Sequence, residues 1–233
     1  MCLPARNEEA TVGAIVARVR AALVDAVPLV DEVLVVDDGS IDATATEAAT
    51  AGARVVRRGP DDGPPGKGQA LRRAVEEAVG DVLVFLDADV RNFDSHFVSG
   101  LLGPVLTEPG TALVKATYRR PLAGSDGPGG RVTELVARPL LARLFPELAS
   151  VAQPLAGECA APRSVLEAVP FADGYGVEIG LLIDVAARCG AGALAQVDLG
   201  ERVHRNRPLD ELAPQAAAVI DVVLDRAGVP AKP

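Results

Sequence analysis

The stretch VLVFLDADV at residues 82–90 decides how this sequence folds. Five apolar residues run directly into Asp87 and Asp89. A short run that is apolar at every position predicts a strand buried on both faces, as in a parallel sheet. If this strand continues to Val90, the Asp87 and Asp89 carboxylates point to the same side of the sheet, where the two like charges repel each other. The sequence therefore predicts a positive partner beside this pair.

Strand and helix patterns alternate outward from this stretch. The near-continuously apolar strands are joined by helices, which is typical of a parallel sheet covered on both faces. MCLPARNEE opens the chain with two apolar residues before a loop signal, so we expect a short first strand or a chain that begins further upstream. The predicted strands are 31–38, 53–58, 81–90, 111–121 and 193–200, and the predicted helices are 9–24, 44–53, 66–79, 131–145 (interrupted at Pro139), 176–190 and 209–226, with a flexible Gly/Pro-rich loop at 122–130.

The predicted fold class is α/β: a Rossmann-like, mostly parallel central sheet with helices on both faces. We expect one domain over residues 1–233, whose first half (1–110) binds one ligand and whose second half (111–233) supplies the other side of a cleft. In such sheets, ligands gather outside the carboxyl ends of the strands. PARNEE, DDGS and DADV all follow strands, so topology alone brings these three segments to one edge.

Composition narrows the class of protein. The formal net charge is −9 and the pI about 4.8, which argue against a nucleic-acid or anionic-membrane surface. An anionic ligand would need a local cation. Cys2, Cys159 and Cys189 are odd in number and share no ligand spacing, so we expect reduced thiols and no zinc site. With no transmembrane run and no signal peptide in the sequence, we expect a cytoplasmic protein without a membrane partner.

Three first-half motifs each leave two interpretations open. Asp87 and Asp89 either cap a turn or bind a divalent cation, because Mg²⁺ prefers one or two carboxylates plus phosphate oxygens. VLVVDDGSIDAT is either a strand-to-helix turn capped by Ser40 or Asp42, or part of a site. GPPGKGQA departs from the Walker A pattern, since Gly68 replaces its Ser or Thr. Lys67, at a helix start, is either solvated or placed to meet a diphosphate.

The second half contains a basic segment, ERVHRNRP. Arg202, Arg205 and Arg207 lie close together in a net-acidic chain, which suggests a phosphate or carboxylate site. His204 in their midst is either an exposed loop histidine or, as a neutral imidazole, a ligand of the same metal as Asp89.

Together these motifs resemble the nucleotide-diphospho-sugar glycosyltransferases of fold type A. LPARNEE, VVDDGSIDAT, GKGQAL and FLDADV appear in the order and spacing of that class. LVKATYRRP, GGRVTELVARPLL, GYGVEIGLLIDV and VHRNRPL narrow the resemblance to the glucosyl-3-phosphoglycerate synthases. This resemblance implies transfer of glucose from UDP-glucose to 3-phosphoglycerate with retention of configuration, dependence on Mg²⁺ or Mn²⁺, and a homodimer.

The resemblance also implies site residues. A uridine pocket would comprise Pro4, Ala5, Glu8 and Asp38. Lys67 would meet the diphosphate, Asp87 would lie near the ribose, and Asp89 with His204 would hold the metal. The acceptor would bind Gly130, Arg131, Thr133 and Asn206, while Tyr175 and Glu178 would lie by the glucose. Glu178 is expected to orient the sugar, with the departing phosphate assisting the acceptor hydroxyl on the same face.

Two other functions compete with this one. A relative that transfers mannose from GDP-mannose to the same acceptor would use the same motifs, since one sugar hydroxyl is distinguished by very few contacts. A phosphorelay receiver domain, a signalling module of another class, also combines an Asp pair, a strand-end Asp and a Lys. Such a domain is about half this length and would leave the Arg/His segment of the second half without a role.

Overall fold

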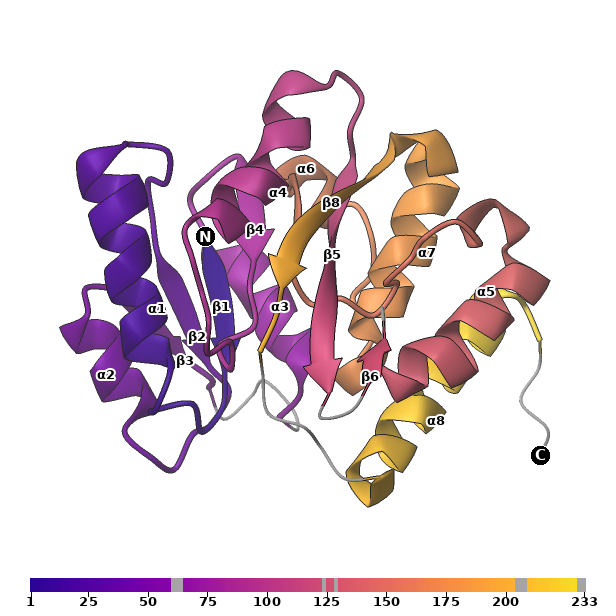
Figure 1. Ribbon diagram of the computed structural model, residues 1–233, viewed down its shortest axis with the longest axis horizontal. Helices are drawn as coiled ribbons and strands as arrows, with labels where there is room; N and C mark the ends of the chain where they lie inside the picture. Colours follow the sequence, from indigo (N-terminus) through magenta and orange to yellow (C-terminus); the bar gives the residue numbers. More distant parts are fainter. Residues whose placement is uncertain (60–64, 123–124, 128–129, 204–208, 230–233) are drawn as a thin grey trace.

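One mixed sheet runs through the computed structural model, which describes residues 1–59, 65–122, 125–127, 130–203 and 209–229 (Figure 1). Its order is β3-β2-β1-β4-β7-β5-β6, with β8 paired to β5. The pairs β1–β2, β2–β3, β1–β4 and β5–β8 are parallel, while β7 and β6 pair antiparallel with their neighbours. The strands are β1 Cys2–Ala5, β2 Leu34–Asp37, β3 Arg54–Arg57, β4 Val82–Phe85, β5 Leu113–Leu122, β6 Ser125–Gly127, β7 Cys159–Pro162 and β8 Leu194–Glu201.

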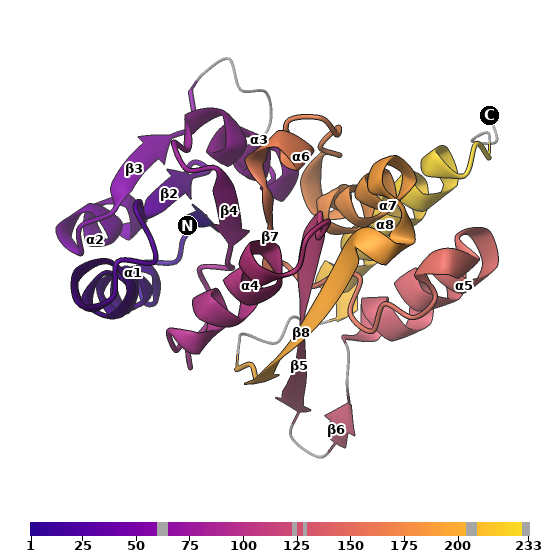
Figure 2. The ribbon, with the colours of Figure 1, turned by 90° about the horizontal axis from the view of Figure 1, so that it is seen from above.

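Helices cover both faces of the sheet, as the sequence predicted. Two cores lie on opposite faces because successive strand residues point opposite ways: Leu34 and Val36 pack with α3, α5, α7 and α8, whereas Val35 packs with α1 and α4. Figure 2 shows these helices to either side of the strands. The α-helices are α1 Val12–Val19, α2 Thr44–Thr50, α3 Lys67–Glu77, α4 His96–Thr107, α5 Arg138–Leu144, α6 Arg163–Leu166, α7 Val177–Cys189 and α8 Leu209–Arg226.

Several sequence-based boundaries were wrong. The strand predicted through residue 90 ends at Phe85, where its pairing with both β1 and β7 stops, so Asp87 and Asp89 lie in the turn beyond it. The described part of the predicted loop 122–130 includes β6, which forms a hairpin with β5. The patterns did not indicate α4 or β7. Both have buried apolar residues.

The helix predicted at 131–145 does not break at Pro139. A π-helical turn, Thr133–Ala137, leads directly into α5, and Pro139 lies in the first turn of that helix. Proline has no backbone N–H, and the wider turn before it accommodates the missing hydrogen bond. α7 ends as predicted at Gly190, whose φ of 87° lies in the left-handed region that favours glycine.

Among the described residues, no helix is long and apolar enough to cross a membrane.

Candidate active site

A cavity of about 410 Å³ opens at the carboxyl ends of β1, β2 and β4, the edge that topology predicted. Predicted site residues supply much of its lining: the four expected at the uridine, Lys67, Asp87, the metal ligand Asp89, and Tyr175. The lining residues are Pro4, Ala5, Arg6, Glu8, Asp38, Pro65, Gly66, Lys67, Ala70, Asp87, Ala88, Asp89, Gly174 and Tyr175. Residues from five separate parts of the sequence thus meet in one pocket.

The loops after β1 and β2 hold each other in place. The Asn7 backbone, at φ 58°, donates its N–H to Ser40 Oγ (3.0 Å), and its side chain accepts from the Ile41 N–H (2.9 Å). The Glu8 N–H donates to Thr44 Oγ1 (2.8 Å). Of the two predicted caps, it is Asp42 that accepts from the Thr44 N–H (3.0 Å) at the start of α2. These bonds fix the wall of the pocket on which Glu8 lies.

Asp38 lines the same pocket. Only 6% of the residue is exposed, and its N–H donates to the Ala5 carbonyl (2.9 Å). Burial raises the pKa of the Asp38 carboxyl, which the nearby Arg58 guanidinium (3.5 Å) partly offsets. A carboxyl with a raised pKa is suited to hydrogen bonding with a polar group of a ligand.

The carboxylate of Asp87 is held by two cations from distant parts of the chain. Lys67 Nζ lies 2.5 Å from Oδ1, and Arg202 Nη2 lies 2.7 Å from Oδ2. Gly157 packs directly against this arrangement, since a Cβ placed there would lie 2.4 Å from Oδ1. Both oxygens of Asp87 therefore have charged partners within the protein.

Asp89 is bound differently. The same Arg202 Nη2 lies 3.0 Å from its Oδ1, and this is the single ion pair that the described residues give it. The positive partner that the Asp pair required is thus present in the protein as Arg202. The sequence predicted a metal beside Asp89 and a phosphate or carboxylate site at Arg202. In the structure, Arg202 binds carboxylates of the protein itself.

Lys67 begins α3 and lies between two carboxylates. Its Nζ is 2.6 Å from Glu178 Oε1 in the first turn of α7, as well as 2.5 Å from Asp87. Burial alone lowers the pKa of Lys67, but the charges of Asp87 and Glu178 raise it well above its usual value. Lys67 is therefore a fixed positive charge on the pocket wall, and the solvated-lysine alternative was wrong.

A buried group behind Arg202 was missed from the sequence. Glu158, fully buried just before β7, places Oε1 2.8 Å from Arg202 Nε and accepts from the Tyr118 hydroxyl at Oε2 (3.0 Å). The Arg202 guanidinium also lies 5.3 Å from the centre of the Tyr118 ring. The signal was present in the sequence, because Glu158 in LAGECAAP is a lone charge in an otherwise uncharged run, like Lys115 in ALVKATY. The ammonium group of Lys115, also buried, donates to the Ala156 carbonyl.

The predicted acceptor residues do not line this cavity. Gly130 and Arg131 lie where the helical segment before α5 begins, and the Gly130 carbonyl accepts from the Glu134 N–H (3.0 Å). Arg131 is exposed, whereas Thr133 is 4% exposed. His204 and Asn206 lie outside the described residues, as do Arg205 and Arg207.

The donor groups suit a hard divalent cation. Asp89 offers carboxylate oxygen at the pocket wall, the ligand type that Mg²⁺ and Mn²⁺ prefer. Within the described ranges, no group of three or more His, Cys, Asp or Glu side chains could hold a metal. A metal bound at Asp89 would therefore take further ligands from a bound anion, as Mg²⁺ commonly does with phosphates.

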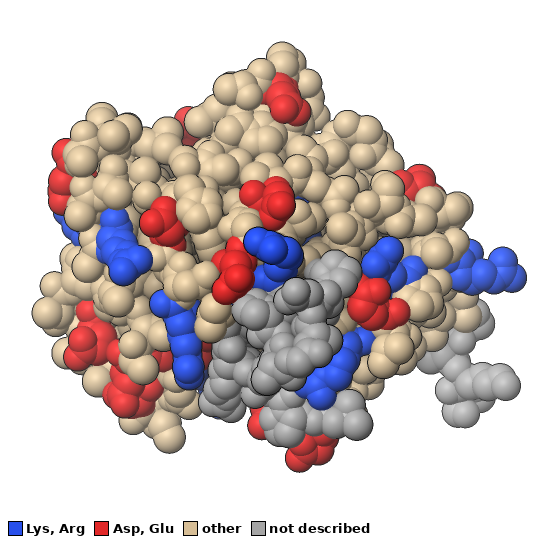
Figure 3. Space-filling view, viewed as in Figure 1, with Lys and Arg blue, Asp and Glu red and all other residues tan. Residues whose placement is uncertain are grey.

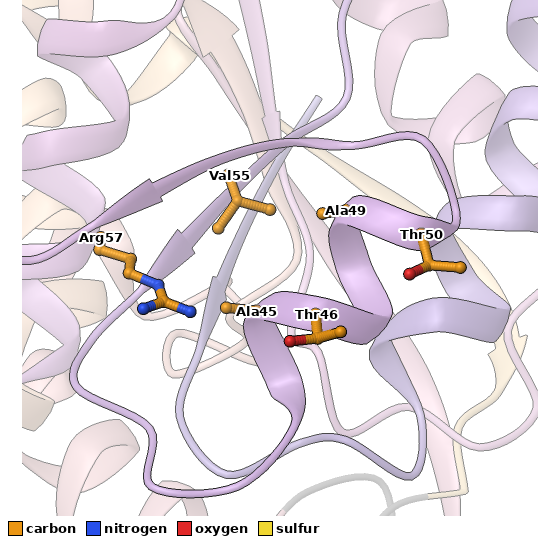
Figure 4. A pocket seen from close by; sticks show the side chains of 6 residues that line it. All are labelled: Ala45, Thr46, Ala49, Thr50, Val55 and Arg57. Carbon is orange, nitrogen blue, oxygen red and sulfur yellow. The ribbon is translucent and has the colours of Figure 1, made fainter.

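One other cavity has few chemically reactive side chains. Figure 4 shows a cavity of about 350 Å³ against α2 and β3 whose walls are alanine, threonine and valine with one charged residue, Arg57. By contrast, acidic and basic side chains lie side by side in the lower centre of Figure 3, around the atoms drawn in grey. The charge cluster of Lys67, Asp87, Asp89 and Glu178 makes the first cavity the candidate active site.

Comparison with known proteins shows the family of this chain. The family profile described as "Glycosyl transferase family 2" matches residues 1–157. Glucosyl-3-phosphoglycerate synthase of Mycobacterium tuberculosis (strain ATCC 25618 / H37Rv) is 53% identical over 239 residues, covering 98% of this chain and 73% of that protein. The enzyme of the same name from Petrotoga mobilis is 43% identical, covering 97% of this chain and 72% of its own length.

Solved structures give the same result. The Mycobacterium tuberculosis synthase in complex with Mn²⁺, UDP-glucose and phosphoglyceric acid superposes with a TM-score of 0.90 at 50% identity, covering 99% of this chain and 80% of that one. Its complex with Mg²⁺ and UDP gives 0.89. These matches confirm the predicted fold, and they do not favour a receiver domain. The chain belongs to glycosyl transferase family 2 and, within it, to the glucosyl-3-phosphoglycerate synthases.

Proposed function

We propose that this protein transfers glucose from UDP-glucose to 3-phosphoglycerate, with retention of configuration, and forms glucosyl-3-phosphoglycerate. The observation that carries the proposal is the pocket beside Lys67, Asp87 and Asp89 in a chain 50% identical to a synthase solved with Mn²⁺, UDP-glucose and phosphoglyceric acid. The position of this pocket, at the carboxyl edge of the parallel strands, is where a nucleotide binds in such sheets.

The donor would lie along the pocket from β1 toward α3. Pro4, Ala5, Glu8 and Asp38 would hold the uridine, since all four line the cavity. Asp87 would lie near the ribose. Lys67, at the amino end of α3, would face the diphosphate, because its charge and the helix dipole both favour an anion.

Asp89, with His204, would hold Mg²⁺ or Mn²⁺. When bound, the metal would neutralise charge on the departing diphosphate. Asp87 is the poorer metal ligand of the pair, because Lys67 and Arg202 occupy both of its oxygens, whereas the described residues give Asp89 an ion pair at Oδ1 alone.

Glucose would lie between Tyr175 and Glu178. Tyr175 is 41% exposed on the pocket wall, and the Glu178 carboxylate is fixed by Lys67 at 2.6 Å. A carboxylate held in an ion pair is a weaker nucleophile than a free one, which favours an orienting role. The proton of the acceptor hydroxyl would then pass to the departing phosphate on the same face of the sugar.

The second half of the chain (111–233) would bind the acceptor, and the first half (1–110) the nucleotide sugar. Arg131 and Gly130 lie at the start of a helical segment, whose first N–H groups favour an anion such as the phosphate. Arg131 offers a planar fork suited to phosphate, and Thr133 and Asn206 would complete the acceptor site.

A donor-by-acceptor activity screen, with and without divalent metal, tests this function. We expect turnover with UDP-glucose and 3-phosphoglycerate and little with GDP-mannose, the alternative donor. Glycerate without its phosphate should be a poor acceptor. Equal turnover with GDP-mannose would show that the donor assignment is wrong.

We propose in addition that the protein works in the cytoplasm as a homodimer. Its three cysteines are free thiols in the structure, which is consistent with a reducing compartment. The homodimer is implied by the family resemblance alone and stays a prediction, which light scattering coupled to size-exclusion chromatography would test.

A further inference from the structure

Arg202 is shared between two sets of carboxylates. One edge of its guanidinium, Nη2, contacts Asp87 (2.7 Å) and Asp89 (3.0 Å), and Nε faces Glu158 (2.8 Å). Only 3% of the arginine side chain and none of the Glu158 side chain is exposed. Buried charges interact strongly because little water screens them. The position and availability of this one cation therefore depend on how strongly each set of carboxylates attracts it.

A metal at Asp89 would compete with Arg202. Both are cations, and Arg202 already lies against Oδ1 of the carboxylate that would bind the metal. If Asp87 and Asp89 were the only partners of the arginine, it would offset more of their negative charge and weaken their attraction for a second cation. Glu158 offers the arginine a further counter-charge on the side away from the pocket.

Glu158 is also built into the frame of the site. Tyr118 in β5 donates its hydroxyl to Oε2 of Glu158, and the neighbouring Ala156 carbonyl is held by the buried Lys115. Gly157, which lies between Ala156 and Glu158 in the sequence, packs against the Lys67–Asp87 pair. The glutamate is thus fixed in position relative to the carboxylates it influences.

We propose that Glu158 is a positioning residue for the metal site. Its negative charge anchors Arg202, so that the arginine neutralises the Asp87–Asp89 repulsion in the metal-free protein and yields Asp89 to a divalent cation when one arrives. The inference rests on the proposed function only in taking Asp89 as the metal ligand. It does not depend on which sugar or acceptor the enzyme uses.

The test is Mn²⁺ affinity, measured by electron paramagnetic resonance or calorimetry with saturating UDP, whose phosphate oxygens would supply the metal's further ligands. Glu158→Gln keeps the shape of the side chain and its bond with Tyr118 but removes the charge, and we expect the Mn²⁺ Kd to rise about tenfold. Tyr118→Phe is the matched control, because it removes the hydrogen bond to the same glutamate, together with the 3.4 Å bond that the tyrosine accepts from Arg202 Nη1, without changing any charge. Its Kd should stay within about twofold of the wild type, since no charge near the metal changes.

The double variant Glu158→Gln/Arg202→Gln separates competition from simple structural damage. It removes one negative and one positive charge, so we expect Mn²⁺ affinity to return to the wild-type value or exceed it. A purely structural role for Glu158 predicts binding at least as weak as in the single variant. Thermal unfolding of each variant shows whether it is folded, and the double variant decides the question if Glu158→Gln is not.

Three results would overturn the proposal: an unchanged Kd in folded Glu158→Gln, no recovery in the double variant, or no millimolar Mn²⁺ binding by the wild-type protein. An error in the proposed function would look different. The wild-type protein would then fail the donor-by-acceptor screen while the order of Mn²⁺ affinities among the variants stayed as predicted.

Discussion

Gly157→Ala should damage both the stability of the protein and its donor site. The added Cβ would lie 2.4 Å from Asp87 Oδ1 and 2.5 Å from Lys67 Nζ, whereas an ordinary contact begins at 3.4 Å. The Asp87 carboxylate must therefore retreat by about 1.0 Å (3.4 minus 2.4). A shift of this size breaks its 2.5 Å bond with Lys67, its 2.7 Å bond with Arg202, or both.

The expected loss of stability follows from those two bonds. A hydrogen bond to a charged group contributes roughly 1.5–3 kcal/mol. Because the Asp87 and Lys67 side chains are only 19% and 18% exposed, water replaces little of what is lost. We expect the free energy of unfolding to fall by about 2–4 kcal/mol. In a chain of this size, each kcal/mol lost lowers Tm by roughly 2–4 °C.

Urea unfolding and calorimetric titration with UDP and Mn²⁺ measure the two effects. Gly103→Ala in α4 is the matched control, since nothing lies within 4 Å of the Cβ it would add. Removing a helical glycine should stabilise the protein by about 0.5–1 kcal/mol and leave UDP binding unchanged. A Gly157→Ala protein with wild-type stability and wild-type UDP affinity would refute the reasoning.

Four further predictions follow from the site and the surface. Asp89→Ala should lose most activity while circular dichroism shows an intact fold, and full turnover of the wild type in excess EDTA would contradict the metal role. Arg131→Ala should raise the KM for 3-phosphoglycerate about tenfold to a hundredfold and leave the KM for UDP-glucose unchanged; equal changes in both would argue against an acceptor role. Glu178→Gln should lower kcat with little change in UDP affinity, and a glycosyl ester trapped on Glu178 would show that it is the nucleophile instead. Burial lowers the pKa of His96, but its hydrogen bond with Asp94 raises it above 6.5. This stabilisation is present below pH 6.5 and lost as pH rises through the raised pKa, so His96→Gln should flatten the urea-unfolding stability profile between about pH 6 and 8.

The sequence by itself determined the class of fold and the location of the donor site. Continuous apolar runs separated by helical periodicity require a sheet buried on both faces, and the carboxyl ends of parallel strands share one edge. PARNEE, DDGS and the Asp87–Asp89 pair could therefore be assigned to one edge before any distance was known, and the family resemblance added Lys67 to them. Their family roles rested on motif order, which is also a property of the sequence alone.

Only the tertiary structure decided what balances the charges in that site. Asp87 and Arg202 are 115 positions apart, and Glu158 reaches the same arginine from the position just before β7, a strand that the patterns did not indicate. Hydrophobic periodicity records which face of an element is buried, but it carries no information about which buried charge meets which. Such pairs form where strands far apart in sequence become neighbours in the sheet, as β4, β7 and β5 do here, and their energy depends on distances that only the folded chain sets.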